Sequence, residues 1–318
     1  RELSGEPVMG PGRSWPPGLR GVLRAPLRGL RHAGTQGFRG VLDRIGPAPV
    51  AAWSLSRALR AGYGGSPLFD LRRSSDNATV SIMAGDDGEA DLGAYATWAG
   101  ADTIFCAKVY DQSGGGSPLV QATPGNQPKF TPNAGPNGRP AIFDDETRAA
   151  TMTLAGGSPV DGMWASGGSA YLCARVGSSL GGSFTHKGEI RLCQFDAFGA
   201  PAGFTRPAFT YGWTGSGFSR AYWRTPALWE AGAAHIWTVE YNASSLTNDP
   251  KLYINGIDAG IIKYDSPSGT TLSDISGMVL FSFQSDGQQI AELTLLSTAL
   301  SPENRSILCS DMIMRYDP

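Results

Sequence analysis

One aromatic-rich segment is the clearest place at which this sequence could bind a ligand. Residues 209–229 contain Phe209, Tyr211, Trp213, Phe218, Tyr222, Trp223 and Trp229. Aromatic rings stack on the C–H faces of sugars, and arginine side chains bind hydroxyl and acidic groups. We therefore expect a carbohydrate-binding site made by Trp213, Tyr222, Trp223, Arg220 and Arg224, with both tryptophans exposed because they border Gly and Arg. The alternative is that the aromatic residues fill a core on alternating strand positions.

The usual signatures of metal, nucleotide and serine-hydrolase chemistry are not visible in the sequence. The four cysteines (Cys106, Cys173, Cys193 and Cys309) are not spaced as zinc ligands, and the three histidines are scattered. We therefore expect no metal and no cofactor. Four cysteines in 318 residues do not make a disulfide framework, so buried free thiols are expected, with a Cys173–Cys193 disulfide as the alternative.

Composition and strand patterning predict an all-β protein. Charged residues make up 17% of the chain, against roughly 25% in an average globular protein, and glycine alone accounts for 43 residues. Asn255 and Gly256 lie between alternating apolar residues, which predicts a β-hairpin with a type I′ turn. Apolar runs between Gly, Ser and Pro turns predict strands within residues 103–110, 170–176, 188–196, 235–242, 251–264, 278–283 and 290–297. Many short strands at this spacing favour a β-sandwich over residues 48–318.

Three segments are predicted to be helical. Residues 51–63 and 91–100 resemble short helices that end at glycines. The segment from Ser301 to Tyr316 has Ser301 as an N-cap, Pro302 in the first helical position and an acidic first turn. Its apolar spacing predicts a buried stripe.

Residues 1–47 differ from the rest of the chain. They carry eight arginines and three acids, whereas the remainder has 18 basic and 25 acidic residues. Apolar residues follow helical spacing at Leu19, Leu23, Leu27, Phe38 and Leu42. We expect an extended basic arm that docks these residues onto another structural protein of a large assembly, with a disordered linker as the alternative. The acidic body does not favour nucleic acid, and neither a membrane span nor a signal peptide is visible in the sequence as given.

The sequence resembles a known glycosidase family over about 80 residues. The resemblance rests on three segments: SLSRAL at 54–59, RRSSDN at 72–77, and VYDQSGGG followed by LVQAT at 109–123. They resemble the catalytic domain of α-L-arabinofuranosidase B (glycoside hydrolase family 54), although Gly115 replaces the family's usual Asn. The later part is similar to concanavalin-like lectin domains, and the YDQSG module also resembles parts of bacteriophage fibre proteins. These resemblances imply a concanavalin-like β-sandwich (jelly roll) with a few short helices.

The resemblance also implies a retaining pair of carboxylates. A loose match to the family's nucleophile segment points to Glu189, and a loose match to its acid segment points to Asp286. The two adjacent cysteines that precede the family's nucleophile are absent here. The ordinary alternatives are a charge at a strand entry for Glu189 and a turn aspartate for Asp286. Asp111, within YDQSG, is expected to cap its own turn, and Arg72 to Asp76 to supply ion pairs at the same corner.

These observations lead us to expect a structural attachment protein rather than an enzyme. It would be a spike, fibre or tail component of a phage or phage-like particle, located in the virion or an extracellular particle. It would form homo-oligomers and bind a cell-surface polysaccharide of the host. An active arabinofuranosidase-like glycosidase and a decoration module without a ligand are the alternatives.

Overall fold

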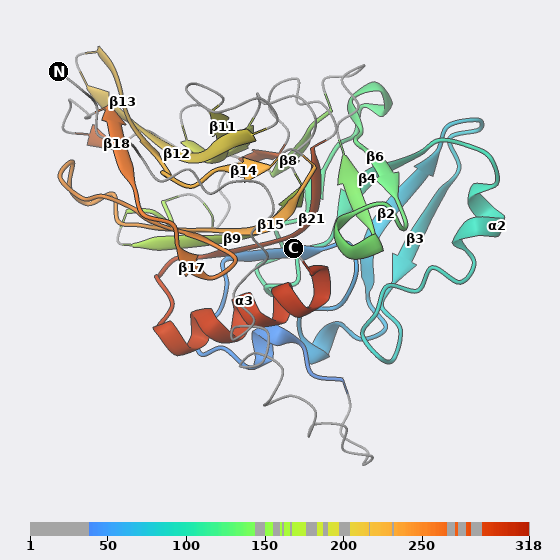
Figure 1. Cartoon of the computed structure of the whole chain (residues 1–318). Helices are drawn as coiled ribbons and strands as arrows, with labels where there is room; N and C mark the ends of the chain where they lie inside the picture. The colour runs from blue at the N-terminus through green and yellow to red at the C-terminus, as the bar shows by residue number, and fades with distance from the viewer. Residues whose placement is uncertain are drawn as a thin grey trace. The chain divides into compact units, whose positions relative to one another are not determined.

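The computed structural model describes residues 38–143, 150–154, 160, 162–165, 167–175, 183–186, 190–196, 204–215, 217–230, 232–265, 271–272, 278–280 and 288–317. They belong to a unit of the chain that begins at Phe38. This start lies before the residue 48 expected from composition, because Val41, Leu42 and Ile45 are buried in the unit's own core. The all-β fold expected from the sequence is confirmed, with two antiparallel sheets and few helices (Figure 1).

The first sheet has β15, β9 and β21 at its centre. Its order is β17 (Ile257–Asp258), β16 (Lys251–Ile254), β15 (Ala234–Tyr241), β9 (Gly168–Arg175) and β21 (Gln289–Leu296), and the other edge of β21 pairs with β1 (Ala51–Ser54) and β7 (Ala141–Phe143). Asn255 and Gly256 form the turn between β16 and β17, with positive φ angles of 53° and 75°. The predicted type I′ hairpin is therefore confirmed.

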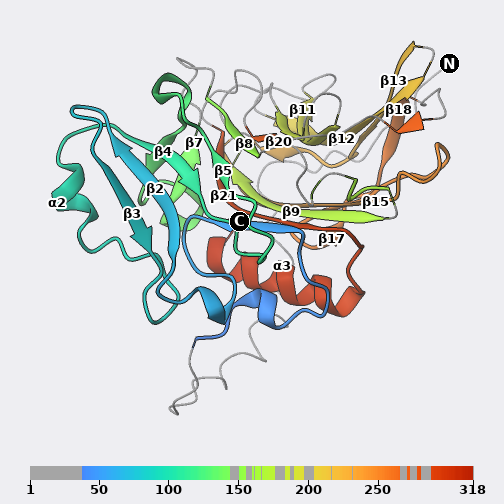
Figure 2. The same ribbon diagram turned by 180° about the vertical axis from the view of Figure 1, so that it is seen from behind.

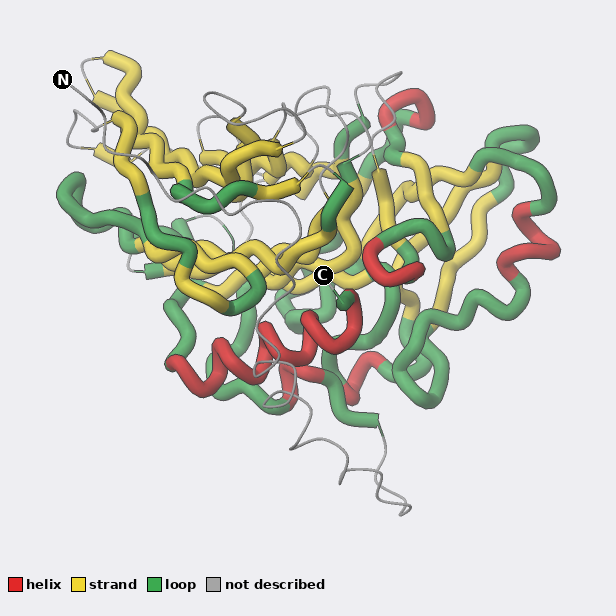
Figure 3. The backbone as a smooth tube through the Cα atoms, in the orientation of Figure 1, coloured by secondary structure: helices red, strands yellow, loops and turns green. Residues whose placement is uncertain are grey.

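The second sheet lies over the first. Its order is β18 (Ile262–Asp265), β13 (Gly217–Arg224), β12 (Phe204–Gly215), β11 (Ile190–Asp196), β10 (Ser183–His186), β20 (Met278–Leu280) and β8 (Met152–Leu154). Two short strands, β14 (Trp229–Glu230) and β19 (Thr271–Leu272), pair with β12. Both sheets are seen as yellow layers in Figure 3.

A group of flanking strands joins the two sheets along one side. This group consists of β2 (Pro67–Arg73), β3 (Thr79–Met83), β4 (Ile104–Val109), β5 (Leu119–Val120) and β6 (Lys129–Thr131). β5 pairs with β8 of the second sheet, and β6 pairs with β7 of the first. Figure 2 shows this group at the opposite end of the sandwich from β13 and β18.

The first sheet is buried on both faces, and β9 shows how. Ala170, Leu172 and Ala174 belong to the apolar core between the sheets. Tyr171 and Cys173 belong to a second core on the other face. This alternation follows from the period of two along a strand, and a strand covered on both faces reads as a continuous apolar run.

The second core is closed by helix α3 (Pro302–Tyr316) and by the 3₁₀ turn η1 (Val41–Asp43). Ser301 caps α3 as predicted, because its hydroxyl accepts a hydrogen bond from the Asn304 N–H at 3.2 Å. The buried stripe of α3 consists of Leu308, Cys309, Met312 and Tyr316. In the part of the chain that the structure describes, no helix has the length and apolar character needed to cross a membrane.

The helix expected over residues 51–63 does not form. Its first four residues make β1, which pairs with β21 and is buried throughout, and only η2 (Ala61–Tyr63) is helical, as a 3₁₀ turn. Pairing at a sheet edge outweighs the weak helical propensity of this short segment. The helix expected near residues 91–100 is present as α2 (Tyr95–Ala99). The remaining 3₁₀ turns are η3 (Pro124–Asn126) and η4 (Pro136–Gly138).

Candidate functional site

Four of the aromatic side chains in this segment lie in the core: Phe209, Tyr211, Trp223 and Trp229. Phe209 on β12 pairs with Trp223 on β13, and their rings stack with centroids 6.0 Å apart. Both rings pack against Tyr241 of the first sheet, with centroids 5.3 and 5.2 Å away, and both are 0% exposed. The expectation that Trp223 is exposed is therefore wrong, because the alternation along β13 turns its ring between the sheets.

Two of the expected sugar-binding residues lie on the opposite face of β13. Tyr222 and Arg224 flank the buried Trp223 and are both partly exposed. Trp213 and Arg220 belong to β12 and β13, but their side chains lie outside the described residues. The sequence therefore identified a strand with a partly exposed side, but Trp223 is not on that side.

Asp111, in the YDQSG motif, locks a turn to strand β1. Its Oδ1 atom accepts hydrogen bonds from the backbone N–H groups of Ala52 and Ser113, both at 2.9 Å. Its Oδ2 atom accepts from the Ser113 hydroxyl at 2.7 Å and from the Ser117 N–H at 3.1 Å. The carboxylate is nearly buried and fully occupied by these donors, so the expected turn-capping role is confirmed.

Gln112 fixes the next stretch of chain. It is 0% exposed, its Oε1 accepts from the Leu59 N–H at 2.6 Å, and its Nε2 donates to the Arg57 carbonyl at 3.1 Å. The most specific sequence motif therefore joins the β4–β5 connection to the segment after β1. The buried Asp111 and Gln112 side chains have a structural role and are not available to a substrate.

The RRSSDN segment forms a separate corner at the turn between β2 and β3. Arg73 pairs with Asp76 at 2.6 Å and lies 3.7 Å from Asp102. Arg72 donates to the Gln127 side chain at 2.6 Å and to the Asn77 side chain at 2.9 Å. The expected internal ion pairs are present, but they hold this turn rather than the YDQSG corner.

Both candidate catalytic carboxylates, Glu189 and Asp286, lie outside the described residues. The described strands nearest to them in sequence are known. β10 ends at His186 and β11 begins at Ile190, on either side of Glu189. β20 ends at Leu280, before Asp286, and β21 begins at Gln289, after it. β10 pairs in antiparallel fashion with both β11 and β20. In sequence, Glu189 is therefore flanked by two strands of the second sheet, whereas Asp286 is flanked by β20 of the second sheet and β21 of the first.

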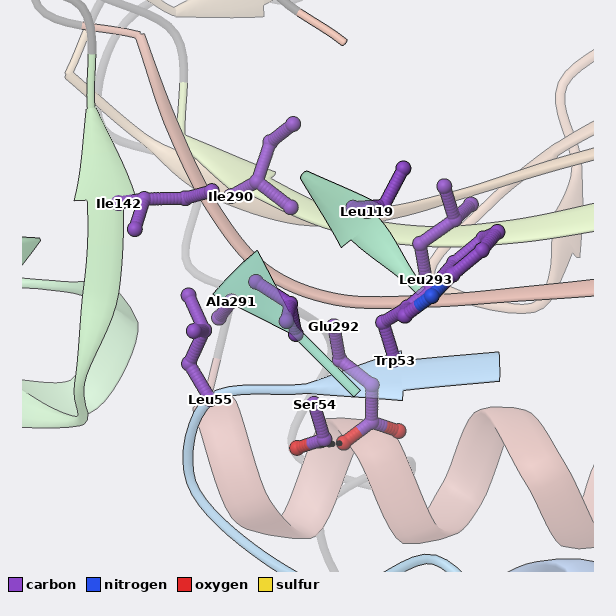
Figure 4. A pocket seen from close by; sticks show the side chains of 10 residues that line it. Trp53, Ser54, Leu55, Leu119, Ile142, Ile290, Ala291, Glu292 and Leu293 are labelled. Atoms are coloured by element: carbon purple, nitrogen blue, oxygen red, sulfur yellow. Dashed lines mark hydrogen bonds between the residues drawn. The ribbon is translucent and has the colours of Figure 1, made fainter. Parts of the chain in front are cut away.

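A small cavity between the first sheet and the flanking strands β4 and β5 is too small to hold a sugar. Figure 4 shows its lining by β1, β5, β7 and β21, with Trp53, Leu119 and Leu293 among the apolar side chains. It encloses about 10 Å³, which is near the lower limit for one water molecule. This space is a packing gap of the core and not a substrate site.

A buried charged network beside this cavity escaped the sequence analysis. The Glu292 carboxylate accepts from Arg57 Nη2 at 3.0 Å and Nε at 3.1 Å, and also from the Tyr316 hydroxyl at 3.0 Å. Burial alone would lower the pKa of Arg57, but the charges of Glu292 and Asp311 outweigh it and raise that pKa. Burial also raises the pKa of the Tyr316 hydroxyl, and Glu292 adds to the shift. The sequence signal for this network was Glu292, the one acidic residue in the apolar segment that forms β21.

The proposed docking residues divide between two parts of the chain. Leu19, Leu23 and Leu27 lie outside the described residues. Leu42 is 2% exposed in the second core, and the Phe38 ring packs so closely against Gly88 that a Cβ there would lie 2.4 Å from it. The structure therefore corrects the expectation for Phe38 and Leu42: Leu42 is buried in this chain's own core, and the partly buried Phe38 packs against it.

The cysteines are free and buried, as the plainer interpretation predicted. The disulfide between Cys173 and Cys193 is absent, because they belong to different cores. Burial raises the pKa of all four thiols, and that of Cys309 reaches about 11. Since the thiolate is the reactive form, these cysteines are poor nucleophiles. Among the described residues, no group of three or more His, Cys, Asp or Glu could hold a metal ion.

Comparison with known proteins identifies related sequences. Residues 43–184 match the family model for the catalytic domain of α-L-arabinofuranosidase B. An α-L-arabinofuranosidase from Hypocrea jecorina is 42% identical over 76 residues, which are 24% of this chain and 15% of that protein. A probable α-L-arabinofuranosidase B from Aspergillus terreus is 37% identical over 116 residues, covering 33% of this chain and 22% of the relative. The matched part is therefore less than a quarter of each relative's length.

The fold similarity extends further along the chain than the sequence similarity. The crystal structure of an arabinofuranosidase complexed with arabinofuranosyl-α-1,2-xylobiose aligns with a TM-score of 0.55 at 18% identity. The alignment covers 87% of this chain and 64% of that one. At this identity the alignment establishes a shared fold, which includes the second half of the chain where sequence similarity has faded.

These matches overturn four expectations from the sequence. The matched model is that of a catalytic domain, and the matched relatives are fungal glycosidases. They contradict the expectation that the protein is a spike, fibre or tail component that attaches to a host, and the expectation that it is not an enzyme. They also contradict its description as a virion structural protein and its expected location in a virion or extracellular particle. The bacteriophage resemblance rested on the YDQSG module, whose side chains hold a corner of the fold. Over residues 43–184 the chain resembles the catalytic domain of α-L-arabinofuranosidase B.

Proposed function

We propose that this protein is a retaining glycoside hydrolase that releases α-L-arabinofuranosyl residues from a polysaccharide or oligosaccharide. The observation that carries the proposal is the match of residues 43–184 to an arabinofuranosidase catalytic domain, together with the shared fold over 87% of the chain. The YDQSG corner and the helix-backed sheet form the rigid part of this fold. Glu189, which in sequence lies between β10 and β11, and Asp286, between β20 and β21, are the proposed catalytic residues.

The reaction needs two carboxyl groups on opposite sides of the glycosidic bond. Glu189 attacks the anomeric carbon and forms an ester as the bond to the leaving oxygen breaks, while Asp286 gives its proton to that oxygen. Water then attacks the same carbon, Asp286 takes the water's proton, and the ester bond to Glu189 breaks. A retaining pair requires the carboxyl groups to be about 5–5.5 Å apart.

The first test uses 4-nitrophenyl α-L-arabinofuranoside, the compound soaked into a mutant of a GH54 arabinofuranosidase. The wild-type chain should release nitrophenolate, and Glu189→Gln should lower kcat by at least about a thousandfold because the nucleophile is lost. Glu303→Gln removes an exposed carboxylate on α3 and serves as the matched control, with no expected change. Nitrophenolate release that is absent from the wild type, or unchanged in Glu189→Gln, would contradict the assignment.

Asp286 is tested by comparing two leaving groups. Nitrophenolate leaves without much help from an acid, whereas a sugar hydroxyl must be protonated. Asp286→Asn should therefore lose far more activity on an arabinoxylan than on the nitrophenyl substrate. Equal losses on both substrates would show that Asp286 is not the acid. NMR of the first product formed should show the same anomeric configuration as the substrate.

A further inference from the structure

An aromatic cluster remains exposed at the edge of the second sheet, away from the buried rings. Trp223 points into the core, so its neighbours Tyr222 and Arg224 lie on the outer face of β13. Tyr264 on the adjacent strand β18 is 55% exposed, the most exposed of the described large hydrophobic side chains. The Tyr222 and Tyr264 rings meet edge to face with centroids 6.0 Å apart, and the Arg224 guanidinium lies 5.1 Å from the Tyr264 ring centre.

A β-bulge produces this arrangement. Tyr222 pairs with Asp265, but Trp223 pairs with Lys263, so Tyr264 is an extra residue without a partner opposite it. Bulges increase the local twist of a strand and redirect a side chain, and they are common at sheet edges and next to binding sites. Here the extra residue is the exposed tyrosine, placed between the outward-facing Tyr222 and Arg224.

The strand that carries Tyr264 is held firmly to the core. The Trp223 Nε1–H donates to Asp249 Oδ1 at 2.7 Å, and Lys263 Nζ lies 3.0 Å from the same oxygen. Lys263 also lies 5.7 Å from the Trp223 ring centre. Because Lys263 immediately precedes Tyr264, this contact fixes the backbone at the exposed ring. A ring that is fixed before binding loses little conformational entropy when a ligand stacks on it.

We propose that Tyr264, Tyr222 and Arg224 form a surface site that binds the polysaccharide chain on which the substrate's arabinofuranosyl group is carried. The choice of ligand rests on the proposed function. The exposed Tyr264 ring offers its surface to the C–H faces of sugars, and Tyr222 and Arg224 pack against that ring and set its orientation.

The position of the cluster suits a long ligand. Glu189 lies in sequence between β10 and β11, which are three and two strands from β13, a span of about 10–14 Å at the usual strand spacing. That span is longer than one sugar ring, so the site would contact the polymer at a distance from the bond that breaks. It would strengthen binding to a polymer through a second point of attachment.

The test measures binding and turnover separately. Retardation of the full chain in a native gel containing soluble arabinoxylan gives a dissociation constant without any catalysis. Tyr264→Ala should raise this constant about three- to tenfold, as expected for the loss of one aromatic stack. Arg224→Ala should weaken binding in the same direction, while Tyr264→Phe keeps the ring and should bind within about twofold of the wild type. Ile257→Ala, which truncates an exposed side chain on β17, is the matched control and should bind like the wild type.

Two results would overturn the proposal. One is wild-type-like retardation of Tyr264→Ala, and the other is an equal loss of retardation in Ile257→Ala. Nitrophenolate release by the wild type tests the proposed catalytic function independently. A chain that binds arabinoxylan through Tyr264 but releases no nitrophenolate would support this site and contradict the hydrolase proposal, so the two failures are distinguishable.

Discussion

Arg57 and Glu292 form a bidentate ion pair beneath the first sheet, with Nη2–Oε1 at 3.0 Å and Nε–Oε2 at 3.1 Å. The Glu292 side chain is 0% exposed and that of Arg57 is 10% exposed. The pair joins the segment after β1 to β21, and Tyr316 from α3 donates a third hydrogen bond to the carboxylate. Three distant parts of the chain therefore meet at one charge.

Arg57→Met should destabilise the fold by about 3–5 kcal/mol, because it leaves the Glu292 carboxylate buried without its counter-charge. The free energy of unfolding is measured by urea denaturation with tryptophan fluorescence as the signal. Arg44→Met is the matched control, because Arg44 also forms an ion pair, with Asp311 at 3.5 Å, but its side chain is 40% exposed. It should change the free energy of unfolding by less than about 1 kcal/mol. Similar changes in the two variants would contradict a buried role for Arg57.

Asp111→Asn tests whether the YDQSG corner is structural. The carboxylate accepts four hydrogen bonds, and an amide nitrogen in place of one oxygen faces N–H or O–H donors. The free energy of unfolding should fall by about 1–3 kcal/mol. The pH profile of any nitrophenolate release should keep its shape, because the residue does not exchange protons with substrate. A shifted pH profile with unchanged stability would instead assign Asp111 to the chemistry.

His235 predicts a dependence of stability on pH. Burial lowers its pKa to about 4, its ring packs edge-on against Trp229 with centroids 4.4 Å apart, and Nδ1 lies 3.1 Å from the Asn255 amide nitrogen. The unfolded chain takes up a proton near pH 6.5, whereas the folded chain does so only near pH 4. The free energy of unfolding is therefore unaffected by His235 above about pH 6.5. It decreases as the pH falls from there towards 4, because only the unfolded chain binds the proton in that interval.

The expected loss at His235 is up to about 3 kcal/mol across that interval. Urea denaturation at pH 7.0, 5.5 and 4.5 of the wild type and of His235→Gln measures it. The variant should lose less stability on acidification, and the difference between the two proteins removes the contribution of carboxylates common to both. Parallel losses in both proteins would contradict a buried, neutral His235.

The sequence predicted the fold class well where a local pattern determines local structure. The Asn255–Gly256 turn and the Ser301 cap are examples, since each depends on residues within a few positions of one another. The helix expected over 51–63 failed because β1 is stabilised by pairing with β21, which lies far away in sequence. Local propensity carries no information about such a partner.

The candidate site was less predictable for the same reason. Alternation along β13 shows that Trp223 and its neighbours face opposite sides, but not which side is the core. The opposing Tyr241 decides that, and it comes from the other sheet. Tyr264 was missed because a bulge, which has no sequence signature here, turned an ordinary strand residue into an exposed one. The pairing of β10 with β20, which are about ninety residues apart in sequence, also follows from topology that residue spacing cannot reveal.

The pairing of β1 with β21 has a consequence for how the protein is made. Ser54 and Glu292 share a hydrogen bond across 238 positions, and the second core needs η1 and α3 together. On the ribosome, β1 is synthesised long before its neighbour, and Tyr171 and Cys173 remain uncovered until α3 emerges. Chains with such distant contacts fold slowly and expose apolar surface while they wait. The amount of folded protein in a cell should therefore depend more on chaperones that bind the incomplete first sheet than on the free energy of unfolding of the finished fold.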